Sequence, residues 1–131
     1  MQDTLQDQAL YVLHPPEGAA IPLVCDSPHS GVRYPGDFGH AVPRSVLRAA
    51  EDTHVEALWG AAPAVGATLV EALFPRSYLD LNRTLDDIDP ALLATPWPTP
   101  LSPGEKTRIG SGLIWRTVKN QPIYDLSLIH I

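Results

Sequence analysis

The chain has 131 residues, a formal net charge of −6 and an apolar content of 44%, which is typical of one soluble domain with a single core. The negative charge argues against nucleic acid or a membrane surface as partner, although a few local arginines could bind a small anionic substrate. A single cysteine, Cys25, excludes an internal disulfide and a C-x-x-C motif. No apolar run is long enough to span a bilayer, and the acidic N-terminal stretch does not fit a signal peptide, so we expect a cytoplasmic protein.

The first expected elements are strands. Residues 11–20 favour a short strand and a loop, and the apolar run at 21–26 predicts a buried strand. The following residues, up to Pro43, are rich in proline and glycine and predict turns.

A helical pattern follows at 45–65, where Pro63 should kink or end the helix and Gly66 should stop it. Strands are then predicted at 67–74 and 76–83. After a proline-rich connection at 95–103, a last strand is predicted at 111–118. This order indicates an α/β fold, in which ligands bind beyond the carboxyl ends of the strands.

The sequence DSPHSG follows the first apolar run directly and contains His29. Pro28 restricts the backbone on both sides of itself, and Gly31 permits a sharp turn or a close backbone approach. A histidine held so rigidly at a strand end suits a metal ligand. A turn histidine with no role is the alternative.

The segment EDTHVEALW contains Asp52 and His54. On a regular helix these two side chains point about 200° apart, so they could not easily reach one metal ion. They could meet if Asp52 capped the helix and His54 lay in its first turn. The alternative is a capping aspartate followed by a solvated, charged helix face.

The sequence DLNR ends the strand predicted at 76–83. Arg83 offers a planar fork for a carboxylate, and Asn82 could orient an oxygen beside it. An ordinary salt bridge from Arg83 to Asp86 or Asp87 is an equally good interpretation.

Weaker candidates are Arg76 and Arg116, which are more typical of ion pairs at the surface or the edge of a core. Cys25 fits a small buried hydrophobic residue in a strand. The sequence contains neither a glycine-rich phosphate loop nor a G-x-S-x-G nucleophile motif.

Several segments, taken together and in order, carry a family resemblance: CDSPHSGVRYPGDF, LRAAEDTHVEALW, FPRSYLDLNR, PWPTPLSPGEKTRIGSGLIWR and QPIYD. The chain resembles the N-formylglutamate amidohydrolase family from about residue 11 to residue 125. The resemblance implies a three-layer α/β fold with a mixed sheet flanked by helices, similar to the zinc carboxypeptidase-like phosphorylase/hydrolase fold and incomplete here.

The resemblance also implies the activity, which is zinc-dependent hydrolysis of N-formyl-L-glutamate to L-glutamate and formate in histidine degradation. It implies a bound zinc ion (Zn²⁺) and a small anionic substrate. Six residues receive roles: zinc ligands at His29 and Asp52, with His54 as a further candidate, and substrate contacts at Asn82, Arg83 and Arg116.

Family members are longer than this chain, and we expect the general base and a third zinc ligand in the part that follows. Residues 1–125 are therefore predicted to be the N-terminal part of a single amidohydrolase domain. Residues 126–131, LSLIHI, do not resemble the family and are expected to be an artefactual tail. Such a fragment should leave a sheet edge and an apolar face uncovered.

Two other functions are consistent with these residues. The protein could be a zinc hydrolase of another amide or peptide substrate, which a substrate panel would reveal. It could instead be a non-catalytic carboxylate-binding fragment, in which Arg83→Ala would abolish ligand binding and His29→Ala would not.

Overall fold

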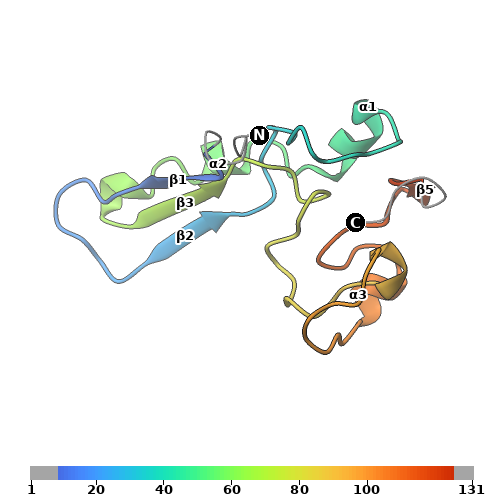
Figure 1. Cartoon of the computed structure of the whole chain (residues 1–131). Helices are drawn as coiled ribbons and strands as arrows, with labels where there is room; N and C mark the ends of the chain where they lie inside the picture. Colours follow the sequence, from blue (N-terminus) through green and yellow to red (C-terminus); the bar gives the residue numbers. More distant parts are fainter. Residues whose placement is uncertain (1–8, 126–131) are drawn as a thin grey trace, which may run out of the picture.

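A mixed three-stranded sheet forms one half of the molecule (Figure 1). The computed structural model describes residues 9–125. Strands β1 (Tyr11–His14), β3 (Thr68–Ala72) and β2 (Val24–Ser27) lie in that order across the sheet. The central strand β3 pairs antiparallel with β1 and parallel with β2. The predicted mixed α/β architecture is confirmed at this level, and the closer likeness to the zinc carboxypeptidase-like fold stays a prediction.

The helices are short, and the helix predicted at 45–65 is interrupted well before Pro63, the residue at which the sequence predicts a kink or an end. The chain leaves the helical region at Glu51, which is extended, and His54 adopts a left-handed conformation with φ 66°. A tertiary bond accounts for the break, because the Asp52 amide donates to the His29 carbonyl at 2.9 Å. The α-helices are α1 (Arg44–Leu47), α2 (Val55–Leu58) and α3 (Glu105–Arg108), and the 3₁₀ turns are η1 (Arg48–Ala50), η2 (Pro63–Val65) and η3 (Pro90–Leu92). Gly66, with φ 92°, ends η2 as predicted.

Three strand predictions need correction. Residues 76–83 form turns, with the Tyr78 amide donating to the Pro75 carbonyl. The predicted strand at 111–118 is reduced to one bridge and to β4 (Thr117–Val118), which pairs with β5 (Gln121–Pro122). The predicted buried strand at 21–26 becomes β2, whose alternate side chains are exposed.

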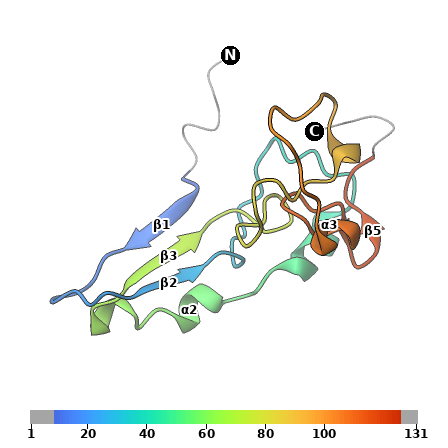
Figure 2. The ribbon, with the colours of Figure 1, turned by 90° about the horizontal axis from the view of Figure 1, so that it is seen from below.

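One face of the sheet is covered and the other is not. Cys25, Ala62, Ala67 and Leu69 form a small buried cluster on the covered face. Helix α2 lies alongside β2 and contacts it (Figure 2). The opposite face forms an apolar hollow of about 590 Å³ whose lining includes Leu10, Tyr11, Asp26, Val70, Ala72 and Phe74. In residues 9–125 no helix is long and apolar enough to cross a membrane.

The main core lies in the loop-rich half and is assembled by α1, η3, β4 and the segment after β5. Its buried members are Phe38, Val42, Leu47, Leu92, Val118, Ile123 and Tyr124. Because strand pairing in this half is sparse, side-chain-to-backbone bonds hold its loops. The Asp87 carboxylate accepts bonds from the Gly104 amide and the Thr107 hydroxyl, both at 2.7 Å.

The buried Asp87 carboxylate makes the stability of this half depend on pH. The Gly104 amide and then the Thr107 hydroxyl hold the pKa of Asp87 below its ordinary value. A carboxyl with a lowered pKa in the folded state contributes stability above the unfolded pKa of about 3.9 and loses it as pH falls through the folded value.

Asp87→Asn is therefore expected to cost about 1–3 kcal/mol of unfolding free energy near neutral pH, because a charge-assisted acceptor is lost. The difference from the wild type should narrow below about pH 3.9, and thermal melts across pH would measure it. Asp86→Asn is the matched control, because the Asp86 side chain makes no hydrogen bond within residues 9–125. Equal destabilisation by both variants, or a difference independent of pH, would contradict this account.

Candidate metal centre

The PHSG turn carries His29 over the end of the sheet. His29 lies two residues beyond the last residue of β2 and is buried. Gly31 touches the backbone just beyond β3, where a Cβ atom would overlap the Phe74 carbonyl. The Arg33 amide then donates to the Leu73 carbonyl at 2.9 Å. The turn is therefore fixed by backbone contact with the neighbouring strand, which is why the sequence needs glycine there.

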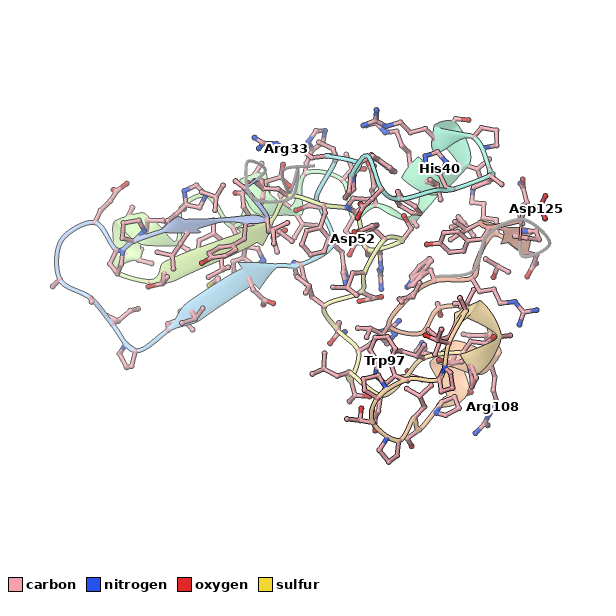
Figure 3. The ribbon with its side chains drawn as sticks, viewed as in Figure 1. Arg33, His40, Asp52, Trp97, Arg108 and Asp125 are labelled. Carbon is pink, nitrogen blue, oxygen red and sulfur yellow. The ribbon has the colours of Figure 1, made fainter. Side chains whose placement is uncertain are left out.

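Both ring nitrogens of His29 face a carboxylate. The Nε2 atom lies 2.7 Å from Oδ1 of Asp80, which is fully buried, and Nδ1 lies 3.4 Å from Oδ2 of Asp52. Asp52 is half-exposed and lies just beyond the carboxyl ends of β2 and β3 (Figure 3). The structure thus brings the two predicted metal ligands, His29 and Asp52, side by side.

Asp80 accepts hydrogen bonds on both carboxylate oxygens. Besides His29, Oδ1 accepts from the Asn82 amide at 2.9 Å. The other oxygen accepts from the Trp115 indole at 3.0 Å and from Arg76 Nη2 at 3.1 Å. Burial alone would raise the pKa of Asp80, but the bonds from His29, the Asn82 amide and Arg76 outweigh it and hold the pKa well below its ordinary value.

The charge on Asp80 sets the form of the histidine ring. An ionised carboxylate only accepts hydrogen bonds, so Nε2 must carry the proton. In neutral His29 this leaves the lone pair on Nδ1, which faces Asp52. A histidine whose second nitrogen is held by a carboxylate is the usual arrangement of a metal-binding imidazole.

The described residues supply two ligands of this kind. An imidazole nitrogen and a carboxylate oxygen are both common zinc donors, and catalytic zinc sites usually have three protein ligands. Within residues 9–125 no group of three His, Cys, Asp or Glu side chains could hold a metal ion.

His54 is not part of this pair. It occupies the cap position of α2 but makes no side-chain cap bond, so the predicted arrangement with Asp52 as the cap is wrong. Its side chain is exposed and lines a separate hollow with Arg33, Arg48 and Glu56. No hydrogen bond or ion pair in the described part of the chain joins the His54 side chain to His29.

Two of the three predicted substrate contacts, Asn82 and Arg83, lie beside Asp80, the partner of His29. Asn82 is exposed, and its amide holds Asp80. Arg83 donates to the carbonyls of Ser111 and Asn82 at 2.8 and 2.7 Å, and its Nη2 lies 3.4 Å from Asp80. The alternative salt bridge from Arg83 to Asp86 or Asp87 does not form.

Arg116 lies elsewhere. It forms an exposed ion pair with Asp89 at 2.9 Å. Across residues 9–125 it makes no hydrogen bond or ion pair with His29, Asp52 or Asp80.

Sequence reasoning missed the roles of Asp80, Arg76 and Trp115. The sequence DLNR gives no indication that its Asp80 is buried and bonded to His29. Arg76 was treated as an ordinary ion pair, yet it reaches both Asp80 and Asp52, the latter at 3.8 Å. The one available signal was the run of polar side chains in RSYLDLNR, without any indication of their partners.

Comparisons with known proteins identify the family of the chain. The family model described as N-formylglutamate amidohydrolase matches residues 21–130, which extends beyond the predicted boundary at residue 125. The crystal structure of N-formylglutamate amidohydrolase from Ralstonia eutropha JMP134 is 63% identical and superposes with a TM-score of 0.86 over 90% of this chain. None of the curated protein sequences compared matches the chain.

These matches define a class and then a family. The matched proteins are named as amidohydrolases, a class of hydrolases that act on carbon–nitrogen bonds other than peptide bonds. The chain belongs to the N-formylglutamate amidohydrolase family. It spans 42% of the length of the Ralstonia protein.

The close packing of Gly31 predicts that Gly31→Ala will displace the PHSG turn and separate His29 from Asp80. The Nε2–H resonance of His29, protected by this bond, should shift or exchange faster, and the melting temperature should fall. Gly36→Ala is the matched control, because nothing lies within 4 Å of a Cβ at Gly36. An unchanged His29 resonance in Gly31→Ala would show that the contact does not set the turn.

Proposed function

We propose that the complete protein hydrolyses the amide of an N-acylated acidic amino acid, converting N-formyl-L-glutamate and water to L-glutamate and formate. The observation that carries this proposal is the position of His29 between Asp80 and Asp52, at the carboxyl end of β2. Family membership supplies the reaction class. A cytoplasmic role in histidine degradation follows from the same substrate.

In this proposal His29 and Asp52 hold a zinc ion. The donor set fits, because Nδ1 of His29 has its lone pair on the side of the Asp52 carboxylate while Asp80 fixes Nε2. When bound, zinc would lower the pKa of a coordinated water to about 7 and polarise the amide carbonyl. The further ligand and the general base would come from the part of the family domain that this chain does not span.

The chain's own residues orient the reactants. Asp80 keeps the ring of His29 in one orientation and one tautomer, and the backbone bond from Asp52 to the His29 carbonyl fixes the second ligand. Asn82 is the exposed polar side chain proposed to bind the substrate carboxylate beside this pair. Arg83 would contribute positive charge while its nitrogens hold the loop. Arg116, which pairs with Asp89, stays a proposed second substrate contact.

Zinc binding by the chain tests the metal site directly. We expect zinc to be retained after dialysis and His29→Ala to lower zinc affinity more than about 100-fold, because losing even an outer-shell partner costs 10–100-fold. His54→Asn is the matched control, since asparagine tolerates the left-handed backbone at this position and His54 is not part of the pair. Loss of zinc in His54→Asn, or equal zinc in His29→Ala, would refute the ligand pair.

The same chemistry predicts that the complete protein releases formate from N-formyl-L-glutamate. A metal chelator should stop this release, and added zinc should restore it. Activity that survives chelation would remove zinc from the proposal. If another amide is hydrolysed faster in a substrate panel, the proposed substrate is wrong, but the proposed metal site is not affected.

We also propose that the rest of the family domain covers the open face of the sheet. The hollow on that face is lined almost entirely by apolar side chains, and β2 has no strand partner on its outer edge within the described residues. An uncovered strand edge beside an apolar surface favours self-association. The Ralstonia structure contains more than twice the length of chain that matches here.

The chain by itself is therefore expected to self-associate as its concentration rises and to bind a hydrophobic dye. Tyr11→Lys should reduce both, because Tyr11 is 61% exposed and lines the hollow. Leu58→Lys should not, because Leu58 lies on α2 outside the hollow although it is 82% exposed. Light scattering would measure the association, and a monomeric wild type without dye binding would contradict the proposal.

A further inference from the structure

The side chain of Glu51 is buried directly before the proposed metal ligand Asp52. The Glu51 side chain is 2% exposed, whereas the side chain of Asp52 is 49% exposed. Glu51 has an extended backbone, with φ −73° and ψ 139°, and neighbouring side chains on an extended backbone point to opposite sides. The inward direction of Glu51 and the outward direction of Asp52 are therefore coupled.

Tyr34 supplies the shorter of the two side-chain contacts to the Glu51 carboxylate. Its hydroxyl donates to Oε1 of Glu51 at 2.6 Å. Nε of Arg48 lies 3.5 Å from Oε2, and the Arg48 side chain is 58% exposed. An ion pair with one exposed partner at this separation contributes little, whereas a short hydrogen bond to a charged oxygen is strong. The bond from Tyr34 is therefore the one that fixes the direction of Glu51.

Tyr34 is itself held by the main core. Its ring stacks on that of Phe38, a buried member of this core, with the ring centres 6.1 Å apart. The guanidinium carbon of Arg44 lies 4.2 Å from the centre of the Tyr34 ring. Aromatic and cation–π contacts of this kind restrict the ring. The loop-rich half therefore sets the position of the Tyr34 hydroxyl, and Glu51 connects this hydroxyl to the segment that carries Asp52.

The backbone bond of Asp52 does not by itself orient the Asp52 side chain. The Asp52 amide donates to the His29 carbonyl at 2.9 Å, which fixes the distance between the two segments. A single hydrogen bond still allows the peptide to turn about it. A turn that brought Glu51 to the surface would carry Oδ2 of Asp52 away from Nδ1 of His29, which lies 3.4 Å from it. Holding Glu51 inside therefore holds Asp52 in front of the imidazole.

We propose that Glu51 is a positioning residue for the proposed zinc ligand Asp52 and that it acts through its hydrogen bond with Tyr34. This role rests on the metal site of the proposed function. Burying a carboxylate is costly, and an apolar side chain could fill the same space. The carboxylate adds a directed bond to Tyr34, which orients Asp52 before zinc binds. A ligand that is already oriented loses less conformational freedom on binding, so the affinity for the metal rises.

The zinc affinity of the complete protein tests this role. Tyr34→Phe keeps the ring and removes the hydroxyl, and Glu51→Ala removes the acceptor. We expect each to weaken zinc binding by about 10–100-fold, as the loss of an outer-shell partner does. Glu51→Gln retains an oxygen that can accept from Tyr34 and should keep an affinity close to that of the wild type. The double variant Tyr34→Phe/Glu51→Ala should bind zinc no more weakly than Glu51→Ala, because both changes remove one bond.

Tyr78→Phe is the matched control. The Tyr78 ring also packs on Phe38, with the ring centres 5.3 Å apart, and its hydroxyl also donates to a carboxylate, that of Asp37, at 3.1 Å. Within residues 9–125 this hydroxyl makes no hydrogen bond with Glu51 or Asp52. Tyr78→Phe should therefore bind zinc as the wild type does.

A second readout needs no zinc. In the metal-free protein, the Asp52 amide should exchange with solvent faster in Tyr34→Phe and Glu51→Ala, because its bond to His29 opens more readily. The Asp80 amide, which donates to the Leu113 carbonyl, should exchange at its wild-type rate. A lower melting temperature with unchanged zinc affinity in both variants would mean a purely structural role and overturn the proposal alone. A wild type that binds no zinc would overturn the proposed metal site, and the role of Glu51 with it.

Discussion

The hydrogen bond between the buried Asp80 carboxylate and Nε2 of His29 is the interaction on which the site depends. A carboxylate with no exposed surface is stable only if its lone pairs are satisfied, because burying a charge without partners is costly. Here the partners come from four directions: the His29 ring, the Asn82 amide, Arg76 and the Trp115 indole. Once these donors are in place, the ring of His29 can adopt only one orientation. Asp80 thereby orients Nδ1 of His29, the nitrogen proposed to bind the metal, from the opposite side of the ring.

The same carboxylate joins the two halves of the molecule. His29 belongs to the turn after β2, whereas Trp115 belongs to the loop before β4. The Asp80 amide also donates to the Leu113 carbonyl at 2.8 Å. The loop-rich half has few strand pairs. Hydrogen bonds that buried carboxylates accept therefore hold its loops together, as strand pairing does in a sheet. Asp87 acts in this way for the loops around Gly104 and Thr107.

The site lies where the covered and uncovered parts of the sheet meet. The turn that follows β2 presents His29 to one side, while Ser27 at the end of β2 and Pro28 in the turn line the apolar hollow. Covering the open face of the sheet, as proposed above, would therefore also enclose the candidate metal centre.

The sequence by itself determined the local features of this protein. Pro28 and Gly31 indicated a rigid turn carrying His29, glycine at position 66 marked the end of a helical turn, and the order of motifs indicated the family. The mixed α/β character also followed from the alternation of apolar runs and turn residues. These features are encoded within a few residues, where backbone sterics and periodicity decide the outcome.

Only the tertiary structure decided the rest. The alternation Leu79–Asp80–Leu81 resembles a half-buried strand, but Asp80 points inward and Leu81 is 51% exposed, the reverse of the usual pattern. A helical pattern at 45–65 gives way where Asp52 must reach the His29 carbonyl. In each case bonds between residues far apart in the chain outweigh a local preference of a fraction of a kcal/mol per residue. The spacing of residues along the sequence does not reveal such bonding partners, because they become neighbours only when the chain folds.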